Sequence, residues 1–196
     1  MRTILLARLA LFTTVAPAAA DELAPLGVKP LAGDACTQLG GGAKTCKKAA
    51  SLAVKGLGTA TLYRVTTEGT VGFAIALDVD GKPALSEPLT QNTDDCGAGK
   101  CDDLKKATPA LKAVRIGGQP AVALELTVAR VRSYNEGGLK PRSYTVREFV
   151  VCGRAGGGVA CQQASFGSLD EPCTATLSAT GEVRSRCDKT TAFYLR

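Results

Sequence analysis

Apolar and polar residues alternate with a period of two over most of the chain, which is the pattern of half-buried β-strands. The clearest run spans residues 70–79, where every second position from Phe73 to Val79 carries a large apolar side chain. Further runs of this kind lie at residues 59–66, 82–89, 111–116, 121–132 and 144–152. Asp80-Gly81 and Gly117-Gly118 are two-residue turn signals, so we expect antiparallel hairpins there.

One segment departs from this alternation near the N-terminus. Between residues 43 and 55, Cys46, Ala50 and Val54 recur at helical spacing among several lysines, and Gly56 follows as a stop signal. We therefore expect one helix at residues 43–55. About ten short strands with regular turn signals predict a mainly β fold, β-rich α+β, as an antiparallel sandwich or strongly bent sheet of short strands with one N-terminal helix.

The eight cysteines add a prediction of four disulfides between nearest neighbours. Cys173 and Cys187 are symmetric about a turn in which Gly181 adopts the left-handed conformation. That register places them on a non-hydrogen-bonded pair, where Cα atoms approach to about 4.5 Å, within disulfide range. The same argument joins two further pairs and leaves a fourth by elimination. The predicted bridges are Cys36–Cys46, Cys96–Cys101, Cys152–Cys161 and Cys173–Cys187.

The first twenty residues have the composition of a secretory signal peptide. Arg2 and Arg8 belong to the positively charged region ahead of a short apolar run, and Ala18 and Ala20 occupy the cleavage positions. We expect a signal peptide at residues 1–20, an irregular arm at residues 21–42 and a single disulfide-stapled β-rich domain at residues 43–196. An uncleaved anchor is the alternative for the first segment. Eight cysteines behind a signal predict an oxidising compartment, so the protein is expected to be secreted or periplasmic.

Composition also excludes several kinds of chemistry. The chain has no histidine and no tryptophan, which excludes imidazole bases and the common histidine-containing zinc sites. Loss of Arg2 and Arg8 with the signal peptide would lower the formal charge from +6 to +4, and no basic stripe interleaves with aromatic residues. We therefore expect no cofactor, no nucleic-acid partner and no membrane span in the mature chain.

Four carboxylates flank the Cys96–Cys101 loop, and they give a weak candidate for a calcium site: Asp94, Asp95, Asp102 and Asp103. Opposed like charges in a hairpin are unfavourable unless a cation offsets them. The preferred alternative is that Asp102 or Asp103 caps a short helical turn, while neighbouring lysines neutralise the other carboxylates.

One hairpin has a sharper functional prediction. Arg154 follows Cys152 by two positions in a small disulfide-closed loop, and this arrangement resembles the reactive loop of Bowman-Birk-type serine protease inhibitors. The resemblance covers ten residues and implies cleavage-site mimicry by Arg154 and Ala155. The chain departs from that family at Gly156-Gly157-Gly158, where the family has rigidifying prolines. Less preorganisation would weaken such an inhibitor.

The main prediction is therefore a secreted, non-catalytic binding or structural domain. Its partner would be an unknown extracytoplasmic protein or small ligand. A secreted serine protease inhibitor that uses the Cys152–Cys161 loop is the first alternative. A hydrolase based on carboxylates or a Ser-Lys pair is the second, since no motif in the chain supports one.

Overall fold

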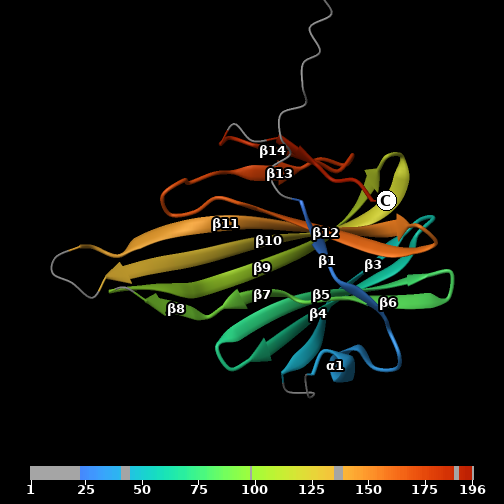
Figure 1. The fold of residues 1–196 in the computed structure, drawn as a ribbon, viewed down its shortest axis with the longest axis horizontal. Helices are drawn as coiled ribbons and strands as arrows, with labels where there is room; N and C mark the ends of the chain where they lie inside the picture. Colours follow the sequence, from blue (N-terminus) through green and yellow to red (C-terminus); the bar gives the residue numbers. More distant parts are fainter. Residues whose placement is uncertain (1–22, 41–44, 98, 135–138, 188–189, 196) are drawn as a thin grey trace, which may run out of the picture.

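The computed structural model describes residues 23–40, 45–97, 99–134, 139–187 and 190–195. It confirms a mainly β fold of antiparallel sheets that include a strongly curled half-barrel (Figure 1). The predicted signal peptide and cleavage site lie outside the described residues. No helix among the described residues is long and apolar enough to cross a membrane.

The strands form three sheets, named here A, B and C. Sheet A has the order β1 (Ala24–Leu26), β12 (Gly158–Phe166), β11 (Arg142–Ala155), β10 (Gln119–Tyr134), β9 (Lys100–Ile116) and β8 (Asp94–Gly97). Sheet B has the order β2 (Val28–Pro30), β6 (Lys82–Ser86), β5 (Thr70–Val79), β4 (Gly58–Thr67) and β3 (Cys46–Val54), with β7 (Leu89–Asn92) paired to β5. Sheet C consists of β13 (Ala175–Leu177), β14 (Glu182–Ser185) and β15 (Thr190–Ala192).

The main core lies between the inner faces of sheets A and B. Phe73, Ile75 and Leu77 on β5 pack there against Leu124 and the other apolar side chains on the same face of β10. All of these side chains are at most 2% exposed, and full burial of each contributes about 1.5 to 3 kcal/mol. The face that the apolar alternation predicts to be buried on β5 and on β10 is therefore the face that lines the main core.

A second core lies on the outer face of sheet A, where sheet C covers it (Figure 1). Phe149 and Val151 on β11 pack there with Val183 and Phe193 from the C-terminal segment. Strand β11 is therefore buried on both faces, because Val150 between them points into the main core. This explains why the sequence of β11 is apolar at consecutive positions.

The four disulfides of the structure join the predicted pairs, of which three follow from turn positions and Cys36–Cys46 from elimination. They are Cys36–Cys46, Cys96–Cys101, Cys152–Cys161 and Cys173–Cys187, with Cα–Cα distances of 4.1 to 5.5 Å. The Cys152–Cys161 pair is directly opposite in the β11–β12 register. Four disulfides in a β domain indicate an oxidising, extracytoplasmic environment.

The helix expected at residues 43–55 is wrong, because Cys46–Val54 form strand β3. A β-bulge lies between Lys48 and Ala50, so the ladder to β4 skips Ala49. The bulge places Cys46, opposite Val65, and Ala50, opposite Leu62, on different faces of sheet B. A spacing of four residues fits the period of a strand as well as that of a helix, so it did not distinguish the two. The described helix is instead α1 (Ala35–Gln38), which packs on the outer face of sheet B.

The arm expected to be irregular contains two short strands. Strand β1 pairs with β12 at the edge of sheet A, and β2 pairs with β6 at the edge of sheet B. Only Gly27 separates them in the chain. Residues 24–30 therefore bridge the two sheets along one side of the sandwich.

Candidate ligand-binding cleft

A cleft of about 730 Å³ opens at the end of the sandwich where two hairpin tips and the bridging segment meet. One tip joins β5 to β6, and the other joins β11 to β12. The walls combine Val28 of β2, Val79 and Ala84 of the first hairpin, and Ala155 and Val159 of the second. Val79 and Val159 also pack against the main core, so the cleft lies directly on the end of that core.

The strand registers show which side chains face this space. Arg154 is opposite Val159 in the β11–β12 ladder, and Lys82 is opposite Val79 in the β5–β6 ladder. Directly opposite residues share a face of a sheet, and both valines face the core. Arg154 and Lys82 therefore project from the inner faces of sheets A and B at the rim of the cleft.

An ion pair joins the two hairpins across this rim. Arg154 donates from Nη1 to Asp80 Oδ2 and from Nη2 to Asp80 Oδ1, the latter at 2.7 Å. The hydrogen bond from Arg154 holds the pKa of the Asp80 carboxyl below its usual value of 3.8, against a smaller opposing effect of burial. Both side chains are well exposed, at 43% for Arg154 and 66% for Asp80. The pair is therefore charged at neutral pH and accessible to solvent.

Positive charge exceeds negative charge at the rim. Lys29 and Lys82 also line the cleft, and in the described part of the chain neither has a carboxylate within 4 Å. Asp80 is the single acidic residue among the lining residues, and Arg154 already binds it. The cleft thus has apolar walls and a cationic rim.

The two residues singled out as a candidate inhibitor loop belong to this cleft. Ala155 lines it, and Arg154 binds Asp80 on the other hairpin. Arg154 would have to leave Asp80 to enter the specificity pocket of a protease. The resemblance pointed to this hairpin. It could not reveal that Arg154 pairs with Asp80 across a cleft, because Asp80 is 74 positions away in the sequence.

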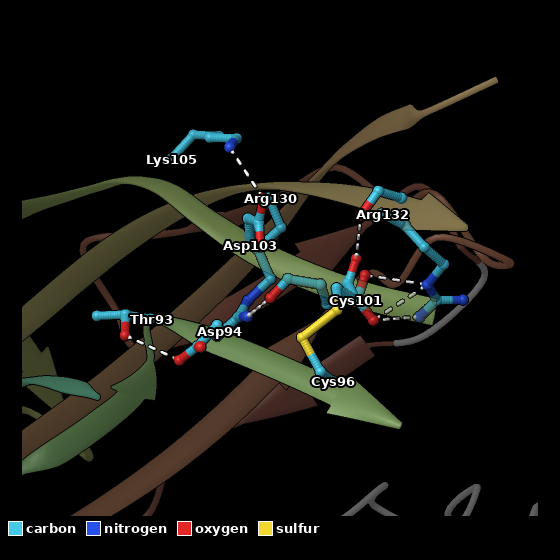
Figure 2. The surroundings of a disulfide bond; sticks show 10 residues. Thr93, Asp94, Cys96, Cys101, Asp103, Lys105, Arg130 and Arg132 are labelled. Carbon is cyan, nitrogen blue, oxygen red and sulfur yellow. Dashed lines mark hydrogen bonds and ion pairs between the residues drawn. A yellow bond between two sulfur atoms is a disulfide. The ribbon is translucent and has the colours of Figure 1, made fainter. Parts of the chain in front are cut away.

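The candidate calcium ligands lie at the opposite end of the long strands, around the Cys96–Cys101 bridge of β8 and β9 (Figure 2). Asp94 is opposite Asp103 and Asp95 is opposite Asp102, so strand alternation places the two pairs on different faces. Among the described residues, no group of three or more acidic or cysteine side chains is placed to hold a metal ion.

Asp102 and Asp103 have other partners. Asp102 accepts hydrogen bonds from Arg132 Nε at 3.0 Å, Arg132 Nη2 at 2.8 Å and the Tyr144 hydroxyl at 3.0 Å. Asp103 pairs with Lys105 at 3.1 Å, as Figure 2 shows. Both aspartates lie within strand β9, so the expectation that one of them caps a helical turn is wrong. The expected neutralisation by a lysine holds for Asp103.

A hydrogen-bonded network extends inward from Asp102. Arg130 donates to the main-chain oxygens of Asp102 at 3.2 Å and Asn92 at 3.0 Å, and to the side chain of Gln91 at 3.3 Å. Gln91 in turn donates to Glu148 Oε2 at 2.6 Å. Burial raises the pKa of Glu148, partly offset by that hydrogen bond. The charges of this network are paired within the protein, which favours a structural role.

Glu148 also borders a smaller pocket of about 220 Å³ with Ala24, Leu89 and residues 163–165. Among the residues that the structure describes, no second acid and no lysine line this pocket. It therefore lacks the pair of groups that acid–base hydrolysis or a Ser-Lys mechanism needs.

Comparison with known proteins finds no matching family, no similar curated protein and no similar solved structure.

Proposed function

We propose that the protein is an extracytoplasmic binding domain that holds a small molecule with an apolar body in the cleft between the β5–β6 and β11–β12 hairpins. The observation that carries this proposal is the cleft itself, a concave and mainly apolar space of about 730 Å³ on the end of the core. Small-molecule sites typically have volumes of about 300 to 1,000 Å³, apolar walls and a few polar groups that orient the ligand.

The elements around the cleft support a preformed site. The Cys152–Cys161 disulfide joins the two strands of one hairpin just before its tip, and β2 holds the opposite wall against β6. The Arg154–Asp80 pair connects the hairpins across the opening. Restraints of this kind lower the entropy that a ligand must remove on binding, and so favour affinity.

The proposal can be tested with the uncharged fluorescent probe N-phenyl-1-naphthylamine, whose emission rises in an apolar environment. The mature, disulfide-intact protein should enhance its fluorescence in a saturable manner. Ala84→Trp places a large ring in the cleft wall and should abolish most of this signal, because Ala84 lines the cleft and lies opposite Leu77 on the inner face of sheet B. Ala110→Trp is the matched control, because Ala110 is exposed on β9 and does not line the cleft.

Circular dichroism would establish that both variants keep the fold. Probe binding by the wild type and by Ala110→Trp, together with loss in a folded Ala84→Trp protein, supports the cleft as the site. No saturable enhancement in the wild type, or equal binding by both variants, contradicts the proposed function.

A further inference from the structure

We propose that the cleft selects ligands that carry a carboxylate, and that Arg154 and Lys82 bind this group while Asp80 competes with it for Arg154. This inference rests on the proposed function and adds the chemical class of the ligand. The expected ligand is an amphiphile with an apolar chain or ring system and one carboxylate at its end.

Both cations at the rim point toward the opening of the cleft. Arg154 and Lys82 project from opposite sheets toward the same opening, since their cross-strand partners Val159 and Val79 both pack against the core. A ligand whose apolar body lies along these valines would place its end group between the two cations. Lys29 also lines the cleft, but it lies opposite Leu85 on the outer face of sheet B and so does not point between them.

Arg154 already binds a carboxylate in the free protein. Asp80 offers it a carboxylate, and both oxygens accept hydrogen bonds from the two terminal nitrogens of the guanidinium. This two-point geometry matches planar carboxylates in particular. In the free protein, Asp80 therefore makes with Arg154 the contact that the carboxylate of a ligand would make.

The Arg154–Asp80 pair can be exchanged at low cost. The Arg154 and Asp80 side chains are 43% and 66% exposed, and exposed ion pairs of this kind are weak because water and salt screen them. Space for the end group exists beside them. Arg154 and Asp80 both line the cleft of about 730 Å³. A ligand carboxylate can thus displace Asp80 without repacking of the core.

The experiment displaces the bound N-phenyl-1-naphthylamine with three ligands that share a twelve-carbon chain: dodecanoic acid, dodecan-1-ol and dodecylamine. At neutral pH and low salt, we expect the acid to displace the probe at least about 5-fold more effectively than the alcohol, and the amine to be the weakest. Added salt should reduce the advantage of the acid, since the selecting interaction is electrostatic.

Charge variants then assign the residues. Arg154→Gln and Lys82→Gln should each weaken displacement by the acid about 3- to 5-fold and leave the alcohol unchanged. Asp80→Asn should strengthen displacement by the acid, because it removes the competing carboxylate. Lys48→Gln is the matched control, since it removes one positive charge from an exposed position on β3 outside the cleft.

The outcomes separate this inference from the proposed function. Equal displacement by the acid and the alcohol overturns carboxylate selection, whereas probe binding would still support a ligand cleft. If Asp80→Asn weakens the acid, Asp80 positions Arg154 instead of competing with the ligand, and that part of the proposal is wrong. Failure of the probe to bind at all counts against the proposed function itself.

Discussion

Replacement of Asp102 by alanine is expected to be among the most destabilising single changes at the β8–β9 end of the protein. The carboxylate is 12% exposed and accepts hydrogen bonds from Arg132 and Tyr144. Arg132 is itself only 16% exposed. Asp102→Ala would therefore leave an enclosed guanidinium without its main partner.

The magnitude follows from these contacts. Removal of one partner from a hydrogen bond to a charged group costs about 1.5 to 3 kcal/mol. Arg132 would retain Asp170, but that carboxylate lies 3.7 Å away and is 77% exposed, so its contribution is small. We expect Asp102→Ala to lower the free energy of unfolding by about 2 to 3 kcal/mol.

Urea unfolding of the disulfide-intact protein, followed by far-UV circular dichroism, measures this change. A double-mutant cycle with Tyr144→Phe tests whether the hydroxyl and the carboxylate act together, and a coupling energy above about 0.5 kcal/mol is expected. Asp95→Ala is the matched control. Asp95 is opposite Asp102 in the ladder but exposed, so its loss should change stability by less than about 0.5 kcal/mol.

The pH dependence supplies an independent test. The hydrogen bond from Arg132 lowers the pKa of Asp102 below its usual value of 3.8. Asp102 therefore contributes stability that is present above pH 3.8 and is lost as the pH falls through the folded-state pKa. The stability difference between wild type and Asp102→Asn should shrink in that acid range. A loss below about 0.5 kcal/mol for Asp102→Ala, with no change of that difference in acid, would refute the assignment.

Three further changes have defined outcomes. Burial raises the pKa of Glu148 above its usual 4.5, so Glu148→Gln should raise the thermal unfolding midpoint at pH 7, and this gain should vanish below pH 4.5. Simultaneous serine replacement of Cys173 and Cys187 should cost about 3 kcal/mol in urea unfolding, and peptide mapping of the unreduced wild type should recover these two as one bridge. Gly58→Ala should cost more than about 2 kcal/mol, because its Cβ would lie 1.8 Å from a main-chain oxygen of β5. Gly69→Ala, at a positive φ of 73° but with open space around it, should cost only about 1 kcal/mol.

Local patterns in the sequence predict much of this fold for a physical reason. A strand with one buried face must alternate, and a two-residue turn with Asp80-Gly81 fixes which residues are opposite. The same counting from the turn at Gly181 places Ala175 opposite Ser185, as observed in sheet C. Alternation and turn geometry act over a few residues, so a short stretch of sequence is enough to predict which side chains are buried and which residues are opposite one another.

The errors arise where the structure depends on a bulge or on distant partners. In β3 the spacing of four residues fits a strand as well as a helix, and no local residue signals the bulge at Ala49 that puts Cys46 and Ala50 on different faces. Residues 24–30 become strands because the free edges of β12 and β6 accept them. The partner of Asp102 is on β10, 30 positions away, so a pattern in the acidic loop alone cannot reveal it.

The two ends of the space between sheets A and B differ, and this difference argues for where a ligand enters. Along β10, the inner-facing positions change from Val128 to Arg130 and Arg132, which the register with β11 keeps on the same face. At that end the arginines are hydrogen-bonded to Asp102 and Gln91, and a ligand would have to break these paired interactions. At the hairpin end the walls are apolar and one exposed ion pair crosses the opening. Because displacement of a screened surface pair costs far less than exposure of an enclosed charge, a ligand should enter at the hairpin end.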